Sequence, residues 1–334
     1  MMTQQINHPA AWKGSDLTSE DMYAFDLEQR HLDALVEAVA GVKHQNKQLK
    51  DVNQQDFAMS TIAADLATVR HELTQGRGFV MIRGFPINDY SLDEIGLMYW
   101  GLGTHFGKGM SQSRYGDRLG YVTHDPDLDE FGRGYRSKKA LGMHTDANDI
   151  ISLLCIRRAK VGGASRLTSA LAVHNEIAAT RPDLLAPLYE GYYFHWFSEA
   201  PPDTDKPVSD YKIPVLSFAE ETLSVCYLRG YMRYAAEAIG TTLPDQLVEA
   251  LDLFDEITNR ADMVHEFSLE AGNAYFVNNY VMMHGRAYYE DWEEPERRRL
   301  LLRLWLEQQP SRPVHPNLRR YYDDLKRAYT RNDK

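Results

Sequence analysis

The segment ALGMHTDANDIISLLCIRR (140–158) contains the features on which the fold assignment depends. A His and an Asp two positions apart, His144 and Asp146, come shortly before the apolar run IISLLCI. Residues two apart on a β-strand point to the same face, so both side chains could approach one metal ion. On a helix, residues two apart point in nearly opposite directions. The non-functional alternative for the same pair is a turn that is capped by the Asp, with the His exposed at the surface.

Pairs of this kind arise by chance, so their local setting must discriminate among them. The chain has 12 His and 48 acidic residues among its 334 residues, so one or two such matches are expected. Three occur, namely His31 with Asp33, His144 with Asp146, and His174 with Glu176. The first lies in 27–42 and the third in 169–181, two segments that repeat apolar residues at helical spacing. Only the second pair is predicted at the start of a strand.

Composition limits the classes of protein to which the chain can belong. A hydrophobic fraction of 43% and a charged fraction of 25% are typical of a soluble globular protein. The net charge of -11 argues against general nucleic-acid binding, which needs a basic face. We find no secretory signal and no apolar segment long enough to cross a membrane. Cys155 and Cys226 lie in apolar runs and are expected to be buried, reduced thiols of a cytoplasmic protein.

The hydrophobic pattern divides the chain into three parts without a linker between them. Residues 1–104 are predicted to be mostly helical, 105–308 to form a strand-rich core, and 309–334 a helical tail. Within these parts, helices are expected over 27–42, 57–73, 91–107, 169–181 and 243–259. Many short strands between Gly, Pro and Asp turns favour a sandwich or barrel, in a single domain that is mainly β with flanking helices (α+β). The expected strands include 79–87, 192–197 (YYFHWF), 273–286 and 298–306. The segment 317–334 is predicted to be a surface helix without chemistry.

A metal site built on the first pair needs another ligand from a distant part of the chain. Two imidazoles and one carboxylate on one face of a metal, with three positions open, form the facial triad of non-haem Fe(II) oxygenases. The candidates for the second imidazole are His195, His265, His284 and His315. We favour His284, because it ends a strand-like segment and the neighbouring Gly285 leaves room for a ligand. A lone His at such a position is more often structural.

Two arginines near the end of the core, Arg299 and Arg303, are embedded among leucines in ERRRLLLRLWL. On a strand, residues four apart share a face. Buried arginines are costly unless they pair with an anion, and a carboxylate ligand bound by two hydrogen bonds is a natural partner. The alternative partner is the acidic cluster at 290–294. A register slip of one residue would also change which of the arginines 297–299 faces the site.

These motifs, in this order, resemble those of a known enzyme group. HTD, the following strand, GGAS (162–165), HGR (284–286) and RRRLLLRLWL (297–306) look like the site motifs of the taurine dioxygenase-like (TauD/TfdA) superfamily of Fe(II)/2-oxoglutarate-dependent oxygenases. γ-Butyrobetaine hydroxylase and clavaminate synthase belong to the same broad group. AWKGSDL (11–17), GRGFVMIRGFPI (76–87) and LLCIRRAKVGGASRL (153–167) resemble framework segments, so the resemblance covers nearly the whole chain. It implies a double-stranded β-helix (jelly-roll, cupin-like) core.

The resemblance also implies roles for individual residues. His144, Asp146 and His284 would be the iron ligands. Arg299 and Ser165 would bind the distal carboxylate of 2-oxoglutarate, although Thr is common at the position of Ser165. Arg303 matches a position that binds the anionic substrate in taurine dioxygenase and is not Arg in other members. Arg303 would either support Arg299 in binding the co-substrate or bind the substrate itself.

The implied activity is hydroxylation of an unactivated C–H bond in a small carboxylate-bearing molecule, such as an amino acid or betaine. The cofactors would be Fe(II), 2-oxoglutarate and O2, with release of succinate and CO2. Asp146 favours oxygen insertion over halogenation, because a small residue replaces this carboxylate in related halogenases. Tyr121, His124 and His195, besides Arg303, are candidate substrate contacts.

Several alternatives remain open at this point. With the same cofactors, the reaction could be a desaturation, an epimerisation or a cyclisation. From other classes, the chain could be a non-catalytic jelly-roll binding protein or a cupin-like enzyme with another metal. The expected partner is a small molecule, with no nucleic acid and no membrane, and a homo-oligomer is possible.

Overall fold

The computed structural model describes residues 3–113, 115–124 and 137–330. Their strands form a seven-stranded sheet in the order β1-β2-β12-β6-β15-β3, with β4 also paired to β15, and a four-stranded sheet in the order β11-β8-β13-β5. Two further pairs are β9 with β10 and β7 with β14. The strands of the larger sheet are β1 Ala24–Asp26, β2 Phe79–Arg83, β3 Lys108–Gly109, β4 Gly120–Val122, β6 Ile150–Arg157, β12 Ala274–Asn278 and β15 Leu300–Glu307. The others are β5 Leu141–His144, β7 Val161–Gly162, β8 Ser165–Ser169, β9 Leu216–Ala219, β10 Thr222–Val225, β11 His265–Phe267, β13 Met282–Arg286 and β14 Tyr289–Glu290.

The alternation of side chains along β15 separates two hydrophobic cores. Leu302 and Leu304 belong to the core that the larger sheet shares with the N-terminal helices. Leu301 and Trp305, on the opposite face, belong to the core that also contains Leu167 of the smaller sheet. This alternation is the period of two expected for a strand buried on both faces. The sheet-dominated fold with flanking helices that the sequence predicted is confirmed, and its two sheets pack as in a jelly roll.

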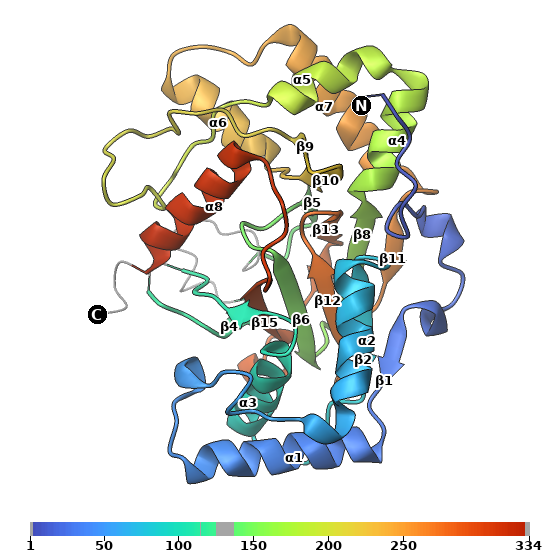
Figure 1. Cartoon of the computed structure of the whole chain (residues 1–334), viewed down its shortest axis with the longest axis vertical. Helices are drawn as coiled ribbons and strands as arrows, with labels where there is room; N and C mark the ends of the chain where they lie inside the picture. Colours follow the sequence, from blue (N-terminus) through green and yellow to red (C-terminus); the bar gives the residue numbers. More distant parts are fainter. Residues whose placement is uncertain (1–2, 114, 125–136, 331–334) are drawn as a thin grey trace.

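The helices lie outside the sheets in two groups (Figure 1). They are α1 Gln29–His44, α2 Ala63–Thr74, α3 Leu92–Gly103, α4 Ala170–Thr180, α5 Leu185–Glu190, α6 Arg229–Ala238, α7 Asp245–Asn259 and α8 Pro316–Tyr329. Helices α2 and α3 contact β2, β12 and β15 of the larger sheet, and α1 packs on α3. Helices α4 and α7 contact β8 of the smaller sheet. Each sheet therefore has its own helical cover.

Two helix starts follow the capping chemistry of the sequence. Ser91 accepts a hydrogen bond from the backbone N–H of Glu94 at 3.3 Å, and the Glu94 side chain accepts one from the Ser91 N–H at 3.0 Å, which completes a capping box. Ser169 likewise accepts from the N–H of Ala172 at 3.1 Å at the start of α4. The helices predicted over 91–107 and 169–181 thus begin at these two caps.

Three predicted strands differ from the observed ones. Residues 192–197 form no strand and contribute only isolated bridges, at Tyr192 and His195. The segment 273–286 is two strands in different sheets, because Asn278 turns the chain by accepting a hydrogen bond from the Tyr280 N–H at 3.0 Å. The HTD motif begins with His144, the last residue of β5, instead of opening the next strand.

The C-terminal helix α8 corrects another prediction. It was expected to be a surface helix, but Leu318, Tyr321, Leu325 and Tyr329 are at most 3% exposed. Its apolar face belongs to the same core as the two sheets. Most charges of the segment occupy the opposite, solvent-facing side, which is the usual pattern of an amphipathic helix. Asp324 is the exception, because it is buried and accepts a hydrogen bond from the Tyr211 hydroxyl at 2.7 Å. Helix α8 is therefore part of the core and lies beside the sheets (Figure 1).

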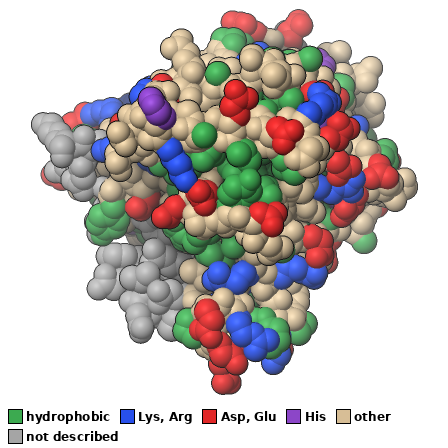
Figure 2. Space-filling model, turned by 90° about the horizontal axis from the view of Figure 1, so that it is seen from below, with side chains coloured by type: hydrophobic (Ala, Val, Ile, Leu, Met, Phe, Trp, Pro, Cys, Tyr) green, Lys and Arg blue, Asp and Glu red, His purple; other side chains and the backbone are tan. Residues whose placement is uncertain are grey.

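The surface seen from below in Figure 1 carries acidic and basic side chains in close alternation (Figure 2). Ion pairs join the helices of this end, including Arg30 with Asp65 at 2.6 Å and Lys43 with Glu94 at 2.5 Å. The two cysteines are buried free thiols, as expected. Among the described residues, no helix combines the length and the apolar character that a membrane crossing requires.

Candidate active site

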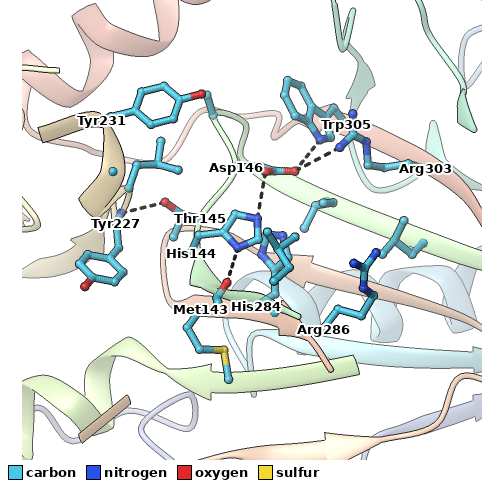
Figure 3. Close-up of a pocket in the computed structure, with 18 of the residues that line it drawn as sticks. Met143, His144, Thr145, Asp146, Tyr227, Tyr231, His284, Arg286, Arg303 and Trp305 are labelled. Carbon is cyan, nitrogen blue, oxygen red and sulfur yellow. Dashed lines mark hydrogen bonds and ion pairs between the residues drawn. The ribbon is translucent and has the colours of Figure 1, made fainter. Parts of the chain in front are cut away.

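The register of the smaller sheet brings together two His that are far apart in sequence. Strands β5 and β13 are antiparallel, and His144 is paired directly with His284. Their ring centroids are 4.3 Å apart, and both rings point into the same cavity (Figure 3). The pairing explains why a His at the end of one strand and a His in the middle of another can bind one ion.

Asp146 reaches the same place from the loop that follows β5. The Thr145 N–H donates to the Tyr227 carbonyl at 3.1 Å, and the Tyr227 N–H donates to Thr145 Oγ1 at 2.9 Å. The Asp146 N–H lies 3.4 Å from Asn279 Oδ1. These contacts fix the loop so that Asp146 Oδ1 is 3.7 Å from His144 Nε2. Convergence thus results from loop contacts, and the strand geometry assumed from the sequence does not apply to Asp146.

The donor atoms of His144, Asp146 and His284 all lie within 4.8 Å of one another, so the three could hold a metal ion. Burial and the nearby His144 lower the pKa of His284 to about 3, which keeps that imidazole neutral. Burial alone would raise the pKa of Asp146, but His284, Arg303 and His144 lower it below its usual value. Neutral imidazoles and an ionised carboxylate are the forms that bind metals. The Nδ1 atom of His284 is buried without a partner among the described residues.

The second oxygen of Asp146 faces β15. Trp305 Nε1 donates to Asp146 Oδ2 at 3.0 Å, and Arg303 Nη1 lies 3.9 Å from the same oxygen. Arg303 Nε in turn donates to Gln112 Oε1 at 2.7 Å. In Figure 3, Asp146 lies between His144 on one side and Trp305 with Arg303 on the other.

A positively charged group of residues lies at one end of the cavity. Arg299 and Arg286 are 5% and 6% exposed, and their guanidinium carbons lie 5.2 Å and 4.7 Å from the centre of the Tyr289 ring. Ser165 is paired with Arg286 in the sheet and shares a hydrogen bond with Tyr275. Burial and the charge of Arg299 lower the pKa of Arg286 to about 10. Two like charges are thus held close together in a desolvated site.

The acidic cluster 290–294 does not neutralise Arg299. Asp291 accepts hydrogen bonds from the backbone N–H groups of Arg299, at 2.9 Å, and Trp292, at 3.1 Å, and not from the Arg299 guanidinium. Within the described residues, the Arg299 guanidinium forms no ion pair, and its buried Nη1 has no hydrogen-bond partner. Arg297 instead pairs with Glu294 at 3.5 Å at the surface. Of the three consecutive arginines, Arg299 is the one that lines the cavity.

The cavity has a volume of about 500 Å³ and extends from these arginines past the His and Asp side chains. Its far wall comes from α6, α8 and the loop after residue 197, which contribute Tyr231, Tyr321, Leu325, Tyr329 and Glu199. Tyr231 faces Trp305 across the cavity (Figure 3). The sequence reasoning missed this wall, because nothing in the apolar pattern of α8 distinguishes a cavity wall from core packing.

Three predicted substrate contacts lie elsewhere. Arg303 lines the cavity, but Tyr121, His124 and His195 are not among its lining residues in the described part of the chain. Tyr121 is 47% exposed, because Val122, the next residue of β4, takes the inward-facing position. The His195 ring instead packs on Phe197, with centroids 4.4 Å apart. Direct contact of these three residues with the substrate therefore stays a prediction.

Comparison with known proteins assigns the family. Residues 45–305 match the family described as taurine catabolism dioxygenase TauD, TfdA family. The chain belongs to this family. It is an iron- and 2-oxoglutarate-dependent dioxygenase, in agreement with the donor set of the site.

Two relatives match most of this TauD-family chain. FR-33289 synthase of Streptomyces rubellomurinus is 26% identical over 340 residues and covers 98% of each chain. Taurine hydroxylase-like protein SAT17 of Stachybotrys chartarum is 25% identical over 317 residues, which are 90% of this chain and 79% of the relative.

Solved structures support the fold assignment. Asparagine oxygenase in complex with Fe(II), 3-hydroxyasparagine and succinate has a TM-score of 0.67 and 16% identity, covering 85% of this chain and 93% of its own. Non-heme iron oxygenase OrfP in complex with Fe and α-ketoglutaric acid has a TM-score of 0.63 and 16% identity, with the same coverage.

Proposed function

We propose that His144, Asp146 and His284 bind Fe(II), and that the enzyme hydroxylates a small amino-acid-like molecule. The observation that carries the proposal is the convergence of these three donors within 4.8 Å, with the imidazole of His284 kept neutral by burial. Two His and one carboxylate on one face of iron leave positions for other ligands. When bound there, Fe(II) with 2-oxoglutarate supplies the oxidation of a C–H bond by O2. The protein's part is to hold, orient and shield the reacting groups.

Arg299 and Ser165 would bind the distal carboxylate of 2-oxoglutarate. Arg299 has a buried guanidinium nitrogen without a partner in the described structure, and an unpaired buried charge is costly. A carboxylate that occupies this end would relieve the repulsion between Arg299 and Arg286. The adjacent Ser165 hydroxyl supplies one more hydrogen bond. Arg286, which the sequence reasoning did not single out, would act as a second cationic neighbour of the co-substrate.

The far wall suggests which substrates fit. Arg303 lies beside Asp146, and Glu199 lies among the phenols of Tyr231, Tyr321 and Tyr329. Arg229, another charged residue of the wall, pairs with Asp252 and Asp255. A substrate with an acidic group and an amine would complement the positive charge of Arg303 and the negative charge of Glu199. Structurally similar oxygenases bind hydroxylated asparagine and arginine, which supports a substrate with both groups.

The test is an anaerobic titration of the apoprotein with Fe(II) and then 2-oxoglutarate. We expect a weak visible charge-transfer band in the wild type and none in His144→Ala. The matched control is His71→Ala, a change at an exposed His of α2, which should keep the band. A wild type that is folded but shows no band would overturn the proposed iron site. With the band established, a screen of amino acids for succinate release identifies the substrate.

A further inference from the structure

We propose that Trp305 is a positioning residue that holds Asp146 for one-oxygen coordination of iron. The inference rests on the proposed iron site and concerns a residue on β15 that does not itself offer a ligand. It identifies Trp305 as the hydrogen-bond donor that decides which carboxylate oxygen faces the metal. Trp305 would act through Asp146 and not on the substrate.

The geometry assigns different tasks to the two oxygens of Asp146. Oδ2 accepts the indole N–H of Trp305 at 3.0 Å and lies 3.9 Å from Arg303 Nη1. Oδ1 is 3.7 Å from His144 Nε2, on the side of the two imidazoles. An indole N–H can only donate and an ionised carboxylate can only accept, so the two groups are complementary. Oδ1 is thus left as the oxygen that faces the metal position.

Trp305 is itself held firmly. Its side chain is 6% exposed, and its backbone is paired with Ile151 of β6 in the larger sheet. The Arg303 guanidinium lies 5.0 Å from the centre of the Trp305 ring, and Gln112 fixes that guanidinium through Nε at 2.7 Å. The Gln112 side chain also donates to the Arg303 carbonyl at 2.7 Å. Asp146 is therefore oriented by a rigid strand, although its own backbone lies in a loop.

One-oxygen binding by Asp146 would leave room at the metal for the other reactants. A carboxylate that binds iron through both oxygens would take one of the positions that 2-oxoglutarate and O2 need. The hydrogen bond from Trp305 to Oδ2 would keep that oxygen from binding the metal. Outer hydrogen-bond partners of metal ligands commonly change metal affinity or activity by about 10- to 100-fold when they are removed. We expect a change of this size for the loss of the indole N–H.

The experiment compares two tryptophans that each lose a single indole hydrogen bond. Trp305→Phe removes the donor to Asp146, and Trp100→Phe removes a 2.9 Å bond to the Val52 carbonyl in the other core. The Fe(II) dissociation constant is measured anaerobically by competition with a chelator, and the charge-transfer band is recorded with 2-oxoglutarate. Trp305→Phe should weaken Fe(II) binding about 10- to 100-fold and shift the band. Trp100→Phe should leave both unchanged.

A double-mutant cycle separates an effect through Asp146 from general damage. In the Asp146→Ala background, Trp305→Phe should cause no further loss of Fe(II) affinity. If Trp305→Phe does not fold, Trp305→Met replaces it, because it also removes the donor and fills part of the same space. Wild-type affinity and band in whichever of the two variants folds would overturn the inference. Absence of Fe(II) binding in the wild type would instead overturn the proposed function.

Discussion

The two ends of the cavity are built from different kinds of secondary structure. At the end where we propose that iron and 2-oxoglutarate bind, His144, His284 and Ser165 come from paired strands of one sheet, and their relative positions follow from its register. Only Asp146, among the three proposed iron ligands, comes from a loop, the one after β5. At the far end, Tyr231 and Tyr329 come from helices, and Glu199 comes from a loop. Strand register allows few alternatives, whereas helices and loops can shift relative to the sheet. This difference suits an enzyme whose co-substrate is constant and whose substrate differs among relatives.

The largest expected effect is on stability, at the helical end. Leu325 of α8 is 2% exposed and lines the cavity. Leu325→Ala should lower the free energy of unfolding by about 3 kcal/mol, through lost burial and the space left behind. Val36→Ala, at a 37% exposed position of α1, is the control and should cost less than about 0.5 kcal/mol. Chemical denaturation measures both.

The same variant tests whether the two ends are independent. If they are, folded Leu325→Ala should bind 2-oxoglutarate with wild-type affinity in the charge-transfer titration. A loss of more than about tenfold would show that the helical wall and the sheet end are coupled, since distant, independent sites should not interact.

The next largest effect is expected on 2-oxoglutarate binding, at Arg299 in the sheet end of the cavity. Arg299→Ala should raise the KM for 2-oxoglutarate about a hundredfold, because about 2 to 3 kcal/mol of charged hydrogen bonding is lost. The control is Arg298→Ala, a partly exposed neighbour whose guanidinium donates to the Glu293 carbonyl. It should leave the KM unchanged. The opposite pattern would mean that the strand register of the arginines has been misassigned.

The residues that the sequence singled out at the sheet end lie close together in the structure. They could be found because polar and charged side chains stand out in apolar segments, as Arg299 does among leucines. The helix caps at Ser91 and Ser169 were predictable for the same reason, because each depends on contacts within a few residues. The sheet-dominated fold followed from the repeated short apolar runs.

The remaining features depend on contacts that no local pattern encodes. Asp146 is positioned by Tyr227 and Asn279, which lie more than eighty residues away in the chain. Its hydrogen-bond partner Trp305 has the sequence pattern of an ordinary core residue. The turn at Asn278 looked like the interior of one long strand, since apolar residues continue on both sides of it. The inward face of α8 likewise has the pattern of any packed helix.

A smaller effect is expected for the charge at the far end. Glu199→Gln keeps the shape of the side chain and removes its charge, so the KM for an amine-bearing substrate should rise about tenfold. The KM for 2-oxoglutarate should stay the same, because that co-substrate lies at the other end. Glu237→Gln, at an exposed site of α6, is the control. Equal changes in both KM values would contradict the division into two ends.

The smallest effect is expected at Tyr121, which the sequence suggested as a substrate contact. Its side chain is 47% exposed and points away from the cavity, so Tyr121→Phe should change neither KM by more than about twofold. The neighbouring Val122 is 5% exposed and does line the cavity. Val122→Phe should therefore reduce turnover, because the larger ring occupies space that the substrate needs. A strong effect at Tyr121 with none at Val122 would mean that β4 presents its opposite face to the substrate, since a shift of one residue exchanges the two faces of a strand.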